Sequence, residues 1–173
     1  TLIARSLFEH LADLSRERGF VLFCDEVYRE LEHDPATRLP AACDLDERAV
    51  SLGSISKGYG LPGLRIGWIA TRDRTIREAV LELKDYTTIC ASAPSELLTA
   101  LALRHRHVLL ERNRMLVERN LCLLDAFFAR HAERFAWVRP TAGPIGFPRL
   151  TGVADVDRFC ERLAAAGVLL LPG

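Results

Sequence analysis

The sequence has no excess of charge of either sign. Its 173 residues include 23 Lys and Arg against 23 Asp and Glu. Binding to nucleic acid or to an anionic membrane surface depends on a basic excess, which releases counterions or draws the protein to the surface. The balance therefore argues against both classes of partner. Apolar residues make up 49% of the chain, which indicates a globular protein and not a disordered one.

The cysteine patterns of metal sites and disulfide frameworks are also missing. The five cysteines are an odd number and widely spaced, with no C-x-x-C pair, which suits neither a zinc site nor a secreted framework. We therefore expect no metal and a reducing, cytoplasmic location. No apolar run approaches the roughly 18 residues that a membrane helix needs, so we expect no membrane partner.

Lysine is scarce. Lys57 and Lys84 are the only lysines among the 23 basic Lys and Arg residues. In a chain that uses arginine for nearly all of its positive charge, each lysine is a candidate for a specific role.

Hydrophobic periodicity predicts alternating helices and strands, which is typical of an α/β fold. The apolar runs are short and continuous, as in buried parallel strands. We expect helices over 2–18 (ended by Gly19), 73–86 and 153–166, a helical run over 95–130 that is broken once or bridges two lobes, and strands over 21–24, 49–55, 65–70, 135–138 and 168–171.

Two charged residues follow strands of this predicted sheet. Asp25 comes after the first strand and Lys57 after the second, and ligand sites in α/β sheets gather at the carboxyl ends of strands. Lys57 lies between two apolar strands, so we expect it to lose solvation and to be partly a neutral amine that can form a Schiff base with a carbonyl. The alternative is a surface lysine in a flexible Ser/Gly loop.

Hydroxyl and guanidinium groups surround this lysine in the sequence. Ser54, Ser56 and Arg65 form a plausible phosphate site, because Arg binds phosphate bidentately and Ser adds neutral donors. The segment from Gly58 to Gly63 formally matches the dinucleotide-binding fingerprint, which needs a helix after it. Its proline and the apolar run beyond it favour a loop leading into a strand instead.

Asp25 and Tyr28 suggest what could bind beside the lysine. A carboxylate at the end of a buried strand needs a partner, and a protonated pyridine nitrogen would serve, keeping the ring an electron sink. Tyr28 could reach the phenolic oxygen of the same ring. The alternative is an Asp that caps the next turn and a Tyr that packs with its hydroxyl in water.

These residues carry a resemblance to a known family. The segments FCDEVYREL and SLGSISKGYGLPGLRIGWIA resemble the core of the class I/II aminotransferases, the fold type I pyridoxal-phosphate-dependent enzymes. The resemblance implies an α/β fold, with part of a large domain of mostly parallel sheet and helices and part of a smaller α+β C-terminal domain. It implies pyridoxal 5′-phosphate as cofactor.

The same resemblance assigns roles to individual residues. Lys57 would hold the cofactor as a Schiff base and move the proton, Asp25 would contact the pyridine nitrogen, and Tyr28 would contact the phenolic oxygen. Ser54, Ser56 and Arg65 would hold the phosphate. The family's Asn-Pro-x-Asn-Pro-Thr-Gly stretch and its substrate-carboxylate arginine have no counterpart in this sequence.

The resemblance also predicts an organisation. Residues 1–100 would be the later part of the large cofactor-binding domain, and 101–173 the interdomain helix with part of the small domain. We therefore expect a piece of a longer protein, inactive alone, with exposed apolar surface where other segments would pack.

The expected activity is an aminotransferase that acts on an α-amino acid and an α-keto acid as a homodimer. Two alternatives remain: another pyridoxal-phosphate reaction of amino acids on the same fold (β-lyase, decarboxylase, cyclase or oxidase), and a truncated, non-catalytic remnant.

Overall fold

A computed structural model describes residues 2–172. The chain divides into two compact units, the first made of residues up to 116 with 141–143, and the second of residues 117–140 with those from 144 onward. The predicted division into 1–100 and 101–173, with its assignment to a large and a small domain, stays a prediction. The two units are described separately below.

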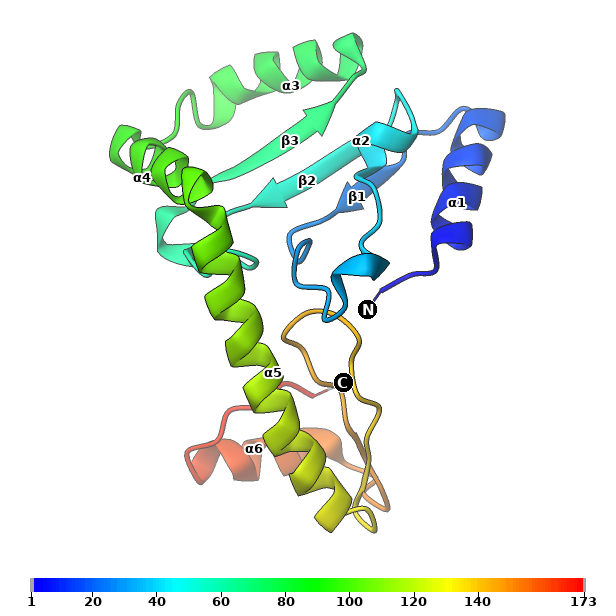
Figure 1. The fold of residues 1–173 in the computed structure, drawn as a ribbon, viewed down its shortest axis with the longest axis vertical. Helices are drawn as coiled ribbons and strands as arrows, with labels where there is room; N and C mark the ends of the chain where they lie inside the picture. The colour runs from blue at the N-terminus through cyan, green and yellow to red at the C-terminus, as the bar shows by residue number, and fades with distance from the viewer. Residues whose placement is uncertain (1, 173) are drawn as a thin grey trace. The chain divides into compact units, whose positions relative to one another are not determined.

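The first unit is built on a three-stranded sheet in the order β1-β2-β3 (Figure 1). β1 (Phe23–Asp25) runs parallel to β2 (Val50–Ser54), and β3 (Gly67–Thr71) runs antiparallel to β2. The predicted strands 21–24, 49–55 and 65–70 are confirmed, each with bounds shifted by one or two residues. The sheet is therefore a parallel pair with an antiparallel third strand.

Two helices enclose the core beside the parallel strands. α1 (Arg5–Arg18) ends as predicted at Gly19, which adopts φ +74° and whose N–H donates to Ser15 O at 2.9 Å. Glycine suits this left-handed position because it has no Cβ to clash. α2 (Ala42–Leu45) packs on α1, and the core between them contains the buried Phe8, Ala42 and Ala49.

The remaining helices of the chain's middle part follow β3. α3 (Arg74–Thr87) begins after Asp73, whose carboxylate accepts N–H bonds from the first turn and so satisfies donors that a helix leaves free. The predicted helical run over 95–130 is broken once, at His105, into α4 (Ala93–Arg104) and α5 (Arg106–Arg130). α5 begins in the first unit and ends in the second.

The second unit packs aromatic side chains of α5 against a short hairpin. β4 (Phe135–Ala136) pairs antiparallel with β5 (Arg149–Leu150), and α6 (Val156–Ala165) follows. The rings of Phe128 and Trp137 stack at 4.6 Å between centroids. Asp125 on α5 accepts a 2.7 Å hydrogen bond from Trp137 Nε1.

The predicted strand over 168–171 is wrong. These residues are not in a strand, and Leu169 and Leu171 are 81% and 87% exposed. A strand needs a neighbour for its N–H and C=O groups, and no strand pairs with this segment within residues 2–172. An apolar run alone could not supply that partner.

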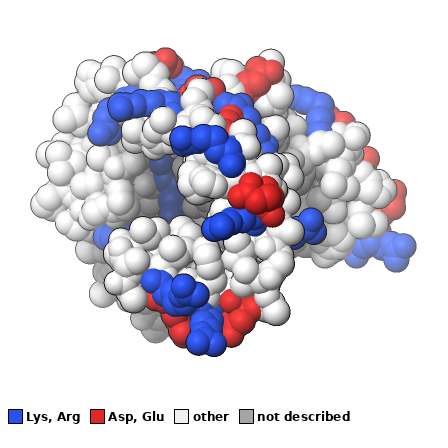
Figure 2. All heavy atoms as spheres, turned by 90° about the horizontal axis from the view of Figure 1, so that it is seen from below, with Lys and Arg blue, Asp and Glu red and all other residues white. Residues whose placement is uncertain are grey.

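The surface is rich in apolar side chains, as predicted. Tyr86 is 89% exposed and Val138 80% exposed. On the face drawn in Figure 2, basic and acidic side chains lie close to one another among broad uncharged areas. Among the helices of residues 2–172, none combines the length and the apolar character needed to span a bilayer.

Candidate active site

The ends of the two parallel strands carry two of the predicted site residues. Asp25 ends β1 and Ser54 ends β2. The register places Asp25 opposite Leu52, two residues before Ser54. Since residues two apart in a strand point to the same face, Asp25 and Ser54 share one face of the sheet.

Lys57 and Tyr28 are brought together from the turns that follow these strands. Lys57 Nζ lies 5.7 Å from the centroid of the Tyr28 ring, within the range of a cation–π contact. Gly60 N donates to Lys57 O at 3.2 Å and closes the lysine's turn. Lys57 is exposed, however, so the expected loss of solvation is wrong for the described chain.

Asp25 also makes the contact that the alternative interpretation described. Its Oδ1 accepts a 3.1 Å hydrogen bond from Val27 N, which caps the turn after β1. No hydrogen bond to Oδ2 is formed within residues 2–172, and the residue is exposed. One carboxylate oxygen therefore shapes the turn, and the other can accept a bond from a ligand.

The three predicted phosphate ligands are only partly assembled. Ser54 Oγ accepts a 3.0 Å bond from Ser56 N, so the two serines form one turn and both hydroxyl hydrogens can still be donated. Arg65 has φ +54° and donates from NH1 to Pro62 O at 3.1 Å. Within residues 2–172 no hydrogen bond links its guanidinium to either serine.

The glycine-rich segment leads into a strand. Pro62 begins a single 3₁₀ turn (Pro62–Leu64), and β3 starts three residues later. The dinucleotide fingerprint requires a helix at this point, so the prediction of a loop running into a strand is confirmed.

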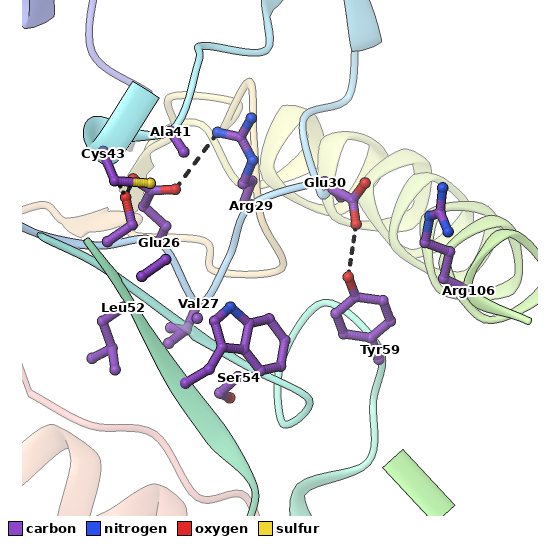
Figure 3. Close-up of a pocket in the computed structure, with 14 residues that line it drawn as sticks. Glu26, Val27, Arg29, Glu30, Ala41, Cys43, Leu52, Ser54, Tyr59 and Arg106 are labelled. Carbon is purple, nitrogen blue, oxygen red and sulfur yellow. Dashed lines mark hydrogen bonds and ion pairs between the residues drawn. The ribbon is translucent and has the colours of Figure 1, made fainter. Parts of the chain in front are cut away.

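Two contacts around the lysine's turn were not found from the sequence. Asn113 Nδ2 on α5 donates to Gly58 O at 2.9 Å. Tyr59 Oη donates to Glu30 Oε2 at 2.9 Å (Figure 3). The partners are 55 and 29 residues apart in the sequence, and no local pattern links them.

Burial changes the acidity of two groups near the sheet. It raises the pKa of Tyr59 to about 12, with the hydrogen bond to Glu30 adding to the effect. Burial, and next the charge of Glu26, raise the pKa of the Cys24 thiol. Both groups are therefore held in their neutral forms near pH 7.

A cavity of about 290 Å³ lies beside β2 and β3 (Figure 3). Its lining includes Glu26, Glu30, Tyr59, Trp68 and Arg106, and Ser54 is the only predicted site residue that borders it. Within residues 2–172, no three His, Cys, Asp or Glu side chains are arranged to hold a metal ion.

The sequence and the fold together place the chain in a known class of proteins. The family of class I and II aminotransferases matches the chain over residues 1–173. The chain therefore belongs to this family. A solved pyridoxal-phosphate-dependent aminotransferase from Streptococcus suis, 32% identical, superposes with a TM-score of 0.90 over 99% of this chain and 45% of its own. The predicted fold class, part of a fold type I aminotransferase, is confirmed.

Curated relatives are similar along most of the chain. Capreomycidine synthase of Streptomyces vinaceus is 35% identical over 94% of this chain, and the L-aspartate:5-guanidino-3-methyl-2-oxopentanoate transaminase of Pseudomonas syringae pv. syringae is 29% identical over 96%. The chain covers 42% of the length of each of them. The 3-methylarginine biosynthesis aminotransferase of Streptomyces arginensis is 48% identical over 38% of this chain and 17% of its own length.

Proposed function

We propose that the protein is a pyridoxal-phosphate-dependent aminotransferase that moves an amino group between an α-amino acid and an α-keto acid. The observation that carries this proposal is the approach of Lys57 to Tyr28 beside the strand ends that present Asp25 and Ser54 on one face. Family membership supports it, because the same fold is found in named aminotransferases.

The chemistry of the donor set fits pyridoxal phosphate. Lys57 supplies an amine for the aldehyde, Asp25 a carboxylate for the ring nitrogen and Tyr28 a phenol for the ring oxygen. Ser54, Ser56 and Arg65 would bind the phosphate, because the serine hydroxyls and the remaining guanidinium N–H groups are donors that suit an anion. When bound, the cofactor supplies the electron sink of the reaction.

Each residue then has one task. Asp25 Oδ2 would accept a hydrogen bond from the ring nitrogen and favour its protonated form. Tyr28 Oη would donate to the ring oxygen. Lys57 would hold the cofactor, and its amine would take a proton from the α-carbon of the substrate as a general base and give it back as a general acid. Lys57 is exposed in the described chain, so a ligand can reach its amine.

The substrate class that we propose carries a guanidino group. Two relatives are named for such compounds: one acts on 5-guanidino-3-methyl-2-oxopentanoate and the other belongs to 3-methylarginine biosynthesis. An arginine-like amino acid and its 2-oxo acid are therefore the first pair to test. By the family resemblance we also propose a homodimer and a cytoplasmic location.

The chain's two lysines provide the test and its control. Protein expressed from the complete reading frame is assayed for keto-acid-dependent amino transfer, with arginine and with aspartate as donors. We expect Lys57→Ala to abolish transfer. We expect Lys84→Ala to retain it, since the hydrogen bond from Lys84 Nζ to Ile89 O lies in an exposed position. Normal turnover by the Lys57 variant would refute the proposal.

The same assay separates the other reactions of the fold. Release of ammonia or carbon dioxide, with no transfer to any keto acid, would favour a lyase, decarboxylase, cyclase or oxidase. Failure of the wild-type protein to bind the cofactor at all would favour a non-catalytic remnant.

A further inference from the structure

Two turns that carry the chemistry are tied together by one hydrogen bond. Tyr28 and Glu30 lie in the turn after β1, and Lys57 and Tyr59 lie in the turn after β2. Tyr59 Oη donates to Glu30 Oε2 at 2.9 Å, and in Figure 3 the carboxylate of Glu30 points at the Tyr59 hydroxyl. Each partner is two residues beyond the side chain that would meet the cofactor, so the bond restrains the turns that hold Lys57 and Tyr28 relative to each other.

Glu30 is itself held in an uncommon conformation. Its φ is +72°, a left-handed value that residues with a Cβ seldom adopt. Glu30 N donates to Glu32 Oε1 at 3.2 Å, and Arg38 lies 3.5 Å from Glu30 Oε1 and 2.9 Å from Glu32 Oε2. Backbone strain of this kind persists only where the surrounding contacts determine it, which is the case here.

The lysine's turn has few other restraints. Asn113 holds Gly58 O, and Gly60 N and Leu61 N bond within the turn to Lys57 O and Ile55 O, both at 3.2 Å. None of these hydrogen bonds reaches the turn that holds Tyr28. The backbones of the two turns do approach each other, since a Cβ added at Gly58 would lie 3.1 Å from Arg29 O, and the bond between Tyr59 and Glu30 adds a directional restraint to this packing.

We propose that Glu30 and Tyr59 are positioning residues that set Lys57 against Tyr28 for the reaction. The role of the two side chains in the reaction rests on the proposed function, but the restraint that they place on the turn after β2 can be measured without cofactor. A half-buried phenol bonded to a carboxylate makes a charge-assisted hydrogen bond, which is stronger than a neutral one.

The test compares two tyrosine variants of the protein from the complete reading frame. Tyr59→Phe removes only the donor, and Tyr86→Phe is the matched control because Tyr86 is 89% exposed. Without cofactor, we expect hydrogen exchange of the Gly60 and Leu61 amides to rise by roughly 10- to 100-fold in Tyr59→Phe, in line with the loss of a bond to a charged group, and not to change in Tyr86→Phe.

The loaded enzyme gives the second readout. We expect kcat of Tyr59→Phe to fall about tenfold with KM within twofold, since the bond orients Lys57 and does not touch substrate. Glu30→Gln keeps an acceptor for the phenol and should lie within threefold of wild type, whereas Glu30→Ala should match Tyr59→Phe.

These measurements test the positioning role of Glu30 and Tyr59 separately from the proposed function. Equal exchange and equal kcat in Tyr59→Phe and Tyr86→Phe would overturn it, as would faster exchange spread evenly over the chain, which indicates a general loss of stability. If Lys57→Ala remains active, the proposed function fails even where the exchange result holds.

Discussion

Gly53 in β2 offers a quantitative test of the sheet that carries the site. A Cβ added there would lie 2.7 Å from Trp68 Cζ2 and still closer to Nε1 and Cε2. Trp68 on β3 pairs with Gly53 in the register, so the indole lies over the glycine. Gly53→Ala must therefore displace the ring. The backbone itself is not an obstacle, because Gly53 is not among the positive-φ glycines.

The expected cost follows from the exposure of the ring. Inserting a methyl group into a packed position costs about 1–3 kcal/mol. Since Trp68 is 38% exposed and can tilt outward, we expect the lower part of that range, about 1–2 kcal/mol. For a protein of this size that is a fall in Tm of about 2 to 8 °C.

The assay is urea unfolding followed by circular dichroism and by tryptophan emission, which should change in Gly53→Ala as the indole moves. Gly63→Ala is the control, because a Cβ there meets nothing within 4 Å, and it should change stability by less than about 0.5 kcal/mol. In a Trp68→Leu background the cost of Gly53→Ala should disappear. An equal cost in both backgrounds, or none in the wild type, would refute the reasoning.

Three further predictions concern other groups. Because the pKa of Tyr59 is raised to about 12, its phenol ionises at lower pH in the unfolded chain than in the folded one, and the free energy of unfolding should fall as pH rises from about 10 to 12. The fall should be less than about 1 kcal/mol after solvent screening. Tyr59→Phe should remove this pH dependence in urea unfolding. At pH 8, alkylation should label exposed Cys90 at least about tenfold faster than Cys24, whose pKa burial and Glu26 raise; equal rates in peptide mapping would contradict this. Asp125→Ala should cost about 1–3 kcal/mol, because it removes the acceptor of both the half-buried Trp137 Nε1–H and the exposed Arg139 Nε–H, and Asp125→Asn should cost less; equal melting curves would count against the Trp137 bond.

The elements that the sequence predicted correctly are those with local signals. Gly19 ends α1 because a left-handed residue favours glycine, and Asp73 begins α3 because its carboxylate caps the first turn. The strands carrying Asp25 and Ser54 were apolar runs of the right length. These signals act within a few residues, so a single sequence shows them.

The errors and omissions depended on partners distant in the sequence. The segment 168–171 has a strand's composition but no neighbour to pair with among the described residues, and the exposure of Lys57 depends on what packs over it. The bond of Tyr59 to Glu30 could not be found either, since no local pattern relates a tyrosine to a carboxylate 29 residues away.

The central claim, that Lys57 holds the cofactor, is tested most directly by reducing the bond between lysine and cofactor and locating the modified lysine. Protein from the complete reading frame is incubated with pyridoxal phosphate, reduced with borohydride, digested and mapped by mass spectrometry. Lys57 and Lys84 lie on different tryptic peptides, because Arg65 and other arginines separate them, so the mapping distinguishes the two. We expect the phosphopyridoxyl group on the peptide that contains Lys57 and not on the one that contains Lys84. An adduct on Lys84 instead, or none on Lys57 in a preparation that transfers amino groups, would contradict the account.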